Sequence, residues 1–138
     1  MKTAFVLALA AIFTLGGCTM AAADGIVEKY WKLVELNGKP VPSLEREPHM
    51  ILKADGRVNG FGGCNAFTGD YKLDASASRL GFGQIASTMM ACAAGMDVEQ
   101  AFHEALRRVD SYMLDGDRLM LARARMAPLA RFEAVHLR

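Results

Sequence analysis

Residues 56–71 read GRVNGFGGCNAFTGDY, and this stretch decides the fold. Apolar and polar residues alternate over residues 57–61, directly after an Asp-Gly turn pair, and this pattern predicts a β-strand. Residues 60–65 are glycine-rich and end in Cys64 and Asn65. Glycine permits a close approach of backbone segments, and an Asn side chain can bond backbone groups across a turn. We therefore interpret residues 60–65 as a strand end that Asn65 ties to its surroundings.

The same glycines have a second interpretation, a loop that cradles a ligand. Phosphate-binding glycine loops lie between a strand and a helix, and that context is missing here. We therefore favour the structural interpretation for Gly60, Gly63, Asn65 and Gly69.

Short segments with the period of a β-strand surround this stretch on both sides. Turn signals such as Asn37-Gly38 and Asp115-Gly116 separate them and favour antiparallel pairing. The predicted strands are residues 30–36, 49–53, 57–61, 70–73, 79–84, 112–114, 118–122 and 129–134.

The period changes at residues 98–109, where apolar residues recur three and four positions apart, as on one face of a helix. Asp97 is the predicted cap, with Gln100 at the capping-box position. The sequence therefore predicts an α+β domain. A curved antiparallel sheet or open, barrel-like β structure would carry one amphipathic helix packed across an apolar face or mouth.

The first 17 residues have the pattern of a secretory leader. Lys2 precedes an uncharged apolar run that is shorter than the roughly 20 residues of a membrane span. The run ends in Leu-Gly-Gly before Cys18, an arrangement typical of a lipoprotein signal, in which Cys18 is the lipid-bearing first residue of the mature protein. The alternative is an ordinary secretory signal that is cut later, within residues 21–23. We expect residues 1–17 to be a signal peptide, residues 18–27 a tether and residues 28–136 one domain.

A lipid on Cys18 would hold the protein firmly to a membrane, because lipoproteins of this kind carry several acyl chains, such as palmitate. Thr19 follows Cys18 where an Asp would favour the inner membrane, so we expect a cell-envelope protein on the outer membrane, facing the periplasm. The chain has 16 Lys and Arg against 15 Asp and Glu, and loss of Lys2 with the leader leaves 15 of each, a net charge of zero. This balance gives no indication of nucleic-acid binding.

Two further cysteines, Cys64 and Cys92, would lie in an oxidising compartment. We expect a disulfide between them, which would stabilise the fold by roughly 3 kcal/mol in the chain-entropy model. The alternative is two buried free thiols, which behave as small hydrophobic side chains.

No combination of residues indicates catalysis, and we predict neither an enzyme nor a cofactor. Ser87 and Thr88 have no marked base and are interpreted as hydroxyls that cap a turn, whereas His103 is expected on the solvated face of the helix. Sulfur and imidazole side chains that can bind copper(I) lie close in sequence, but they contain no chelating pair, so we predict no metal site. This sulfur and imidazole group comprises Met89, Met90, Cys92, Met96 and His103.

Two segments resemble the signatures of the META domain family. The first is residues 56–71, and the second is IASTMMAC, residues 85–92, which contains Thr88 and Cys92. The elements of the first signature are Gly60, Gly63, Cys64, Asn65, Gly69 and Tyr71. The resemblance extends over roughly residues 28–134, and the leader is similar to that of the HslJ-type heat-shock lipoproteins. One departure is Met89, where many relatives have an Arg, so any role of that Arg is not inherited.

The resemblance implies a small, mostly β fold in the cell envelope, with links to stress, and it supplies no catalytic residue. Our first functional hypothesis is a non-catalytic, lipid-anchored envelope domain with a stress-related, structural or interaction role and an envelope protein as partner. The alternative is a carrier that holds a small hydrophobic ligand or acyl chain in a barrel-like cavity. In that alternative, Phe61, Phe67, Phe82 and Phe102 would line the cavity instead of filling the core.

Overall fold

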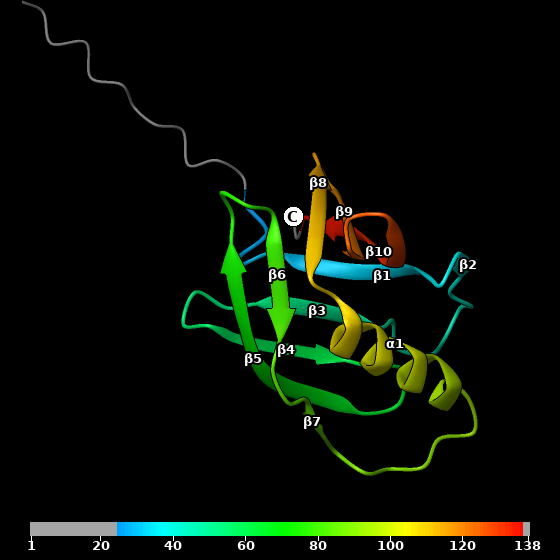
Figure 1. The fold of residues 1–138 in the computed structure, drawn as a ribbon. Helices are drawn as coiled ribbons and strands as arrows, with labels where there is room; N and C mark the ends of the chain where they lie inside the picture. Colours follow the sequence, from blue (N-terminus) through cyan, green and yellow to red (C-terminus); the bar gives the residue numbers. More distant parts are fainter. Residues whose placement is uncertain (1–24, 137–138) are drawn as a thin grey trace, which may run out of the picture.

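The computed structural model describes residues 25–136, so the predicted leader, Cys18 and most of the tether lie outside the described residues. Eight antiparallel strands follow one another around a closed barrel in the order β1, β3, β4, β5, β6, β8, β9 and β10, and β10 pairs with β1 (Figure 1). These strands are β1 Tyr30–Leu36, β3 His49–Leu52, β4 Arg57–Phe61, β5 Ala66–Asp74, β6 Arg79–Phe82, β8 Ser111–Asp115, β9 Arg118–Arg123 and β10 Ala127–Val135. The predicted α+β class with barrel-like β structure is confirmed.

The barrel closes where β1 pairs with β10, from Tyr30 opposite Val135 to Leu36 opposite Ala130. Closure is possible because β10 is nine residues long and pairs with β9 along its other edge. Both strands are irregular, β1 between Leu33 and Glu35 and β10 beside Pro128. Bulges of this kind bend a strand and increase its twist, so they help the sheet to curve into a barrel.

The junction between β6 and β8 is the weakest part of the barrel wall. The two strands share a single residue pair, Arg79 opposite Ser111. Two backbone hydrogen bonds flank it, from Leu80 N–H to Asp110 O (3.4 Å) and from Tyr112 N–H to Ser78 O (3.1 Å). At this junction the chain leaves the barrel after β6, forms the helix, and returns as β8.

Two short strands, which the sequence period does not predict, extend the wall. These are β2 Lys39–Pro40, which pairs with β1, and β7 Ala86–Ser87, which pairs with β5. The β5 strand also begins earlier than predicted, at Ala66, because residues 66–69 pair with β4.

The helix α1, Met96–Arg108, lies across one end of the barrel and inserts its apolar face into the interior (Figure 1). Phe102 and Leu106 are fully buried there. The Phe102 ring contacts Phe67 edge-on, with 5.5 Å between ring centroids, and lies 5.7 Å from the Phe132 ring. Each such aromatic side chain stabilises the fold by about 2 kcal/mol or more through burial.

Trp31, on β1, is a further large side chain of the core. Its ring is fully buried, and its indole N–H donates to the carbonyl of Ile26 at 2.8 Å, so the polar atom of the ring is satisfied. Two of the phenylalanines that the carrier hypothesis would place around a cavity, Phe67 and Phe102, are instead buried in the packed interior. Within residues 25–136, no helix has the length and apolar character needed to cross a membrane.

The predicted cap of the helix is wrong. Gly95, with φ of +92°, is the N-cap, and Asp97 lies in the first helical turn without a capping hydrogen bond. The reason is the left-handed backbone at Gly95, which starts the helix two residues before the position that the apolar pattern predicts. Asp97 still places negative charge near the positive end of the helix dipole.

Candidate functional site

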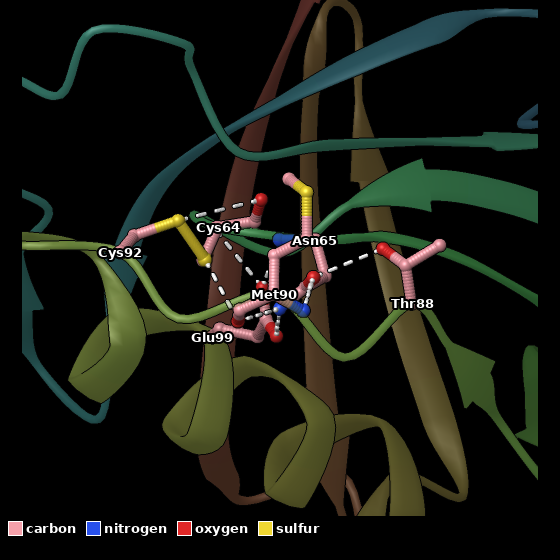
Figure 2. Close-up of a disulfide and its surroundings, with 6 residues drawn as sticks. All are labelled: Cys64, Asn65, Thr88, Met90, Cys92 and Glu99. Atoms are coloured by element: carbon pink, nitrogen blue, oxygen red, sulfur yellow. Dashed lines mark hydrogen bonds between the residues drawn. A yellow bond between two sulfur atoms is a disulfide. The ribbon is translucent and has the colours of Figure 1, made fainter.

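The two signature segments meet at the start of the helix. The turn between β4 and β5, the loop after β7 and the first turn of α1 converge on the carboxamide of Asn65 (Figure 2). Asn65 is buried, with 2% of its surface exposed. Polar groups this deeply buried must be hydrogen-bonded, so the partners of Asn65 define the chemistry of the site.

All four hydrogen-bonding positions of the Asn65 carboxamide are filled. Its Oδ1 accepts from the Thr88 hydroxyl at 2.9 Å and from Met90 N–H at 2.7 Å. Its Nδ2 donates to the Met90 carbonyl at 3.1 Å and to Glu99 Oε1 at 2.9 Å. Asn65 therefore fixes the loop through the backbone of Met90 and the hydroxyl of Thr88.

Glu99 is the acceptor at the centre of this cluster, and its side chain is only 7% exposed. Its Oε2 accepts from two backbone groups, Cys64 N–H at 2.9 Å and Asn65 N–H at 2.5 Å. Burial by itself would raise the pKa of Glu99, but hydrogen bonds from the Asn65 side chain and from these two backbone groups outweigh it and lower the pKa. Glu99 is therefore an ionised structural acceptor, in the first turn of the helix, for N–H groups of the signature turn.

A disulfide joins the same segments covalently. Cys64, next to Asn65, is bonded to Cys92, and their Cα atoms are 5.8 Å apart. Cys64 is buried and Cys92 is half-buried at the surface. The bridge closes the chain over 28 residues, so the loop that carries Thr88 and Met90 is held at one end by a covalent bond and along its length by Asn65.

The backbones of Gly63 and Gly95 contact each other directly. A Cβ atom on Gly63 would lie 2.6 Å from the Gly95 carbonyl oxygen, and a Cβ on Gly95 would lie 2.3 Å from the Gly63 carbonyl oxygen. Both residues have positive φ, +136° and +92°. Only glycine satisfies both the space and the backbone angle, so this contact places the helix start against the signature turn.

The other signature residues also have structural roles. A Cβ on Gly60 would lie 2.4 Å from the Phe67 ring, and one on Gly69 would lie 2.7 Å from the Ile85 side chain. The Tyr71 hydroxyl donates to the Lys53 carbonyl at 2.6 Å and so ties β5 to the turn after β3.

His103 does not lie on a solvated face, and that prediction is wrong. Its ring is half-buried and contacts Phe67 edge-on at 5.2 Å, and its Nε2 is buried without a hydrogen-bond partner among the described residues. Burial lowers the pKa of His103, the Glu99 carboxylate partly opposes that shift, and Arg107 adds to it. His103 follows Glu99 by one helical turn on the same face of the helix, and its burial there favours the neutral imidazole.

The sulfur side chains near this site do not gather around a metal. Among residues 25–136, no group of three or more His, Cys, Asp or Glu side chains is placed to hold a metal ion. Cys92 is in a disulfide and so does not offer a thiolate. Met89 and Met90 are exposed to solvent instead of being directed toward His103 or the core.

A hollow of about 400 Å³ opens beside the disulfide, between the loop that precedes β3 and the loop that precedes α1. Leu44, Phe61 and Met90 provide its apolar surface, together with the disulfide. The Arg46 guanidinium lies over the Phe61 ring, 4.1 Å from its centroid, and adds a cation to the rim.

A second hollow, of about 390 Å³, lies on the outer face of β1, β8, β9 and β10. The ion pair between Arg131 and Glu35, 2.9 Å apart, lies in it. None of the signature residues lines this second hollow.

A family model for the META domain matches residues 24–136. The chain belongs to the META domain family. No sequence among curated proteins matches it.

Three solved structures share the fold of this META domain. An NMR structure of a protein from Burkholderia xenovorans is 21% identical, with a TM-score of 0.62 over 81% of this chain and 85% of that chain. A second NMR structure is 25% identical, with a TM-score of 0.62 over 78% of this chain and 90% of that chain. A crystal structure of a DUF4847 family protein from Bacteroides vulgatus is 18% identical, with a TM-score of 0.61 over 78% of this chain and 93% of that chain.

One central residue of this site, Glu99, was not predicted from the amino-acid sequence. The signal was present in the helix pattern, because Glu99 precedes Phe102 by three residues and Leu106 by seven, on the face that the helix buries. A charged residue at a core-facing position is rarely buried without partners. Here the partners come from the signature turn, 34 and 35 residues earlier in the chain.

Proposed function

We propose that this META domain is a non-catalytic interaction domain of the cell envelope, held at the outer membrane by a lipid on Cys18 and facing the periplasm. The family and the barrel fold fit a binding role without catalysis. The leader and the Leu-Gly-Gly-Cys sequence that ends in Cys18 support the anchor. The similarity of the leader to HslJ-type lipoproteins supports a role under envelope stress.

One observation carries the proposal: the polar groups of the signature segments bond to one another. Thr88, Asn65 and Glu99 form a closed set of hydrogen bonds. A nucleophile or general base needs a free lone pair or proton directed toward a substrate, and these groups use theirs within the fold. Because aromatic side chains fill the barrel interior, the domain presents its binding capacity on its surface.

We assign the contact surface to the hollow beside the disulfide. The exposed Met90 side chain and the ring of Phe61 give it apolar area, and Arg46 supplies a charged rim. Interfaces are enriched in methionine, aromatic residues and arginine. The loop that presents Met90 is fixed by the disulfide and by Asn65, so little conformational entropy is lost on binding.

The anchor is tested in cells that express the full chain. We expect labelled palmitate to be incorporated into the wild-type protein and lost in Cys18→Ala, which should leave the membrane fraction. Unchanged membrane retention of Cys18→Ala would contradict the anchor.

The contact surface is tested by a photoreactive amino acid placed at Ala93, which lines the hollow and is exposed. Lys72 on β5 is the matched exposed control position, away from the hollow. We expect a defined protein adduct at position 93 that is absent at position 72 and is weakened by Leu44→Asp. Equal adducts at both positions would contradict the assignment. A lipid-sized mass bound to the purified protein in native mass spectrometry would favour the carrier alternative.

A further inference from the structure

Methionine accounts for most of the large hydrophobic side chains that are exposed in the described part of the chain. Among residues 25–136, six large hydrophobic side chains are exposed, and five of them are methionines. These are Met89, Met90, Met96, Met113 and Met126. A thioether at the surface differs from other apolar side chains in one chemical respect, because two-electron oxidants convert it to a sulfoxide.

Three of these thioethers combine high exposure with a backbone that is fixed by other groups. Met89 is 93% exposed, Met126 is 87% exposed and Met90 is 61% exposed. Figure 2 shows the Met90 side chain extending away from Glu99 and the helix. Met90 is held through its own N–H and carbonyl, both bonded to the Asn65 carboxamide.

The turn that carries Met126 is fixed in a similar way. Ala124 N–H donates to Asp110 Oδ1 at 2.8 Å, and Arg125 N–H donates to the Ser111 hydroxyl at 3.0 Å. Met126 N–H closes the turn on the Arg123 carbonyl at 3.2 Å. Neither loop depends on its thioethers for its conformation, so a polar oxygen added to the sulfur would remain in water and disturb no packing.

We propose that Met89, Met90 and Met126 are sites of reversible oxidation to methionine sulfoxide by hypochlorous acid or a related two-electron oxidant. The thioether sulfur attacks the chlorine of hypochlorous acid and releases hydroxide, which leaves a chlorosulfonium ion. Water then attacks the sulfur and displaces chloride, and two protons leave, one of which neutralises the hydroxide. The net reaction converts one thioether and one hypochlorous acid to one sulfoxide, one chloride and one proton. The sulfur is oxidised and the chlorine is reduced, so the step balances without a further reactant. A methionine sulfoxide reductase reverses it with two thiols, which become a disulfide as the oxygen leaves as water.

The chain contains an internal control for this inference. Met50 is a thioether of the same chemistry that is fully buried in the core, with 0% exposure. Its oxidation would force a polar group into the packed interior, so it requires unfolding first. Oxidation of the exposed thioethers requires no bound partner, because it depends only on their exposure, on the chemistry of sulfur and on the anchoring of their loops.

The experiment is a stepwise titration of the purified, processed protein with hypochlorous acid, followed by peptide mass spectrometry. We expect Met89, Met90 and Met126 to gain one oxygen at least about tenfold faster than Met50. The urea midpoint of unfolding should remain unchanged, and a methionine sulfoxide reductase with dithiothreitol should restore the starting masses.

A triple variant, Met89→Leu with Met90→Leu and Met126→Leu, keeps the apolar surface without the reactive sulfur. It should fold as the wild type does and consume three fewer equivalents of oxidant before Met50 reacts. Oxidation of Met89, Met90 and Met126 no faster than that of Met50 would overturn the proposal. So would a fall in the unfolding midpoint when only these three residues are oxidised.

Discussion

Removal of the Glu99 carboxylate should be among the most damaging single changes in this domain, although it deletes no apolar packing. Glu99→Ala leaves three buried N–H groups without an acceptor: the backbone N–H of Cys64, the backbone N–H of Asn65 and one of the two N–H groups of Asn65 Nδ2. Hydrogen bonds to a charged group contribute about 1.5–3 kcal/mol each, and bonds that share one acceptor do not add fully. We expect a loss of about 4 kcal/mol from the free energy of unfolding, a large part of a domain's total stability.

Glu99→Gln is the sharper test, because it keeps the shape of the side chain. The Gln oxygen can accept from the two backbone N–H groups, but its amide nitrogen would then face Asn65 Nδ2, a donor against a donor. Asn65 cannot rotate to relieve this, because its Oδ1 accepts from Thr88 and Met90. We expect a loss of about 2 kcal/mol, between the wild type and Glu99→Ala.

The assay is urea unfolding at neutral pH, with the disulfide intact in every sample. The midpoint should fall in the order wild type, Glu99→Gln, Glu99→Ala, while the slope stays unchanged. Glu104→Ala is the matched control, because Glu104 is exposed on the same helix, and it should shift stability by no more than about 0.5 kcal/mol. If both Glu99 variants were as stable as Glu104→Ala, Glu99 would not hold the signature segments together.

The pH dependence follows from the same hydrogen bonds. The folded-state pKa of Glu99 is lower than the ordinary carboxyl value of 4.5, so the unfolded state takes up a proton first as the pH falls. The contribution of Glu99 is therefore fully present above about pH 4.5 and is lost as the pH falls through the folded-state pKa. In Glu99→Gln, unfolding free energy should fall less steeply in this acid range.

Three further predictions concern the residues around this cluster. Reduction of the disulfide, or Cys64→Ser with Cys92→Ser, should lower the free energy of unfolding by about 3–4 kcal/mol, measured by urea unfolding with thiol counts by mass. Gly63→Ala should cost about 2 kcal/mol or more, because its Cβ would meet the carbonyl oxygen of the opposing glycine at 2.6 Å, whereas Gly81→Ala, which has open space, should not share that cost. Because burial lowers the pKa of His103, its neutral form stabilises the fold above the ordinary value of 6.5, and that contribution is lost as the pH falls through the folded-state pKa. His103→Leu should flatten the stability profile as the pH falls below 6.5, and an unchanged slope would refute the assignment.

Periodicity predicted most of the wall of the barrel. Residues 30–36 and 57–61 form β1 and β4 with the predicted bounds, because each strand has one face in the core and one toward water. The strands β2 and β7 have two residues each, too short for any period to appear. The pairing of β10 with β1 depends on β-bulges and strand twist, and the alternation of apolar and polar side chains predicts neither of these.

The site was predictable where residue type alone limits the structure, and not where burial depends on a distant segment. Glycine, Asn65 and the cysteine pair indicated the signature turn. Only glycine lets two backbones approach closely, and only cysteine forms a disulfide. His103 looked like part of the solvated side of an amphipathic helix, and the pattern gave Glu99 no role, although it lies on the face that the helix buries. The partner of Glu99 lies on the signature turn and that of His103 lies on β5, and sequence periodicity does not identify these partners.

Around the disulfide, the groups that fix the loop differ from the side chains that line the hollow. The bonds that fix the loop use backbone atoms, the cystine and the side chains of Asn65, Thr88 and Glu99. The side chains of Met90 and Ala93 take no part in those bonds and line the hollow. Substitutions at Asn65 should therefore change binding only through the fraction of folded protein, whereas substitutions at Ala93 should change binding at constant stability. If the affinity for a partner changed only in proportion to the folded fraction in both the Asn65 and the Ala93 variants, the contact surface would lie elsewhere on the barrel.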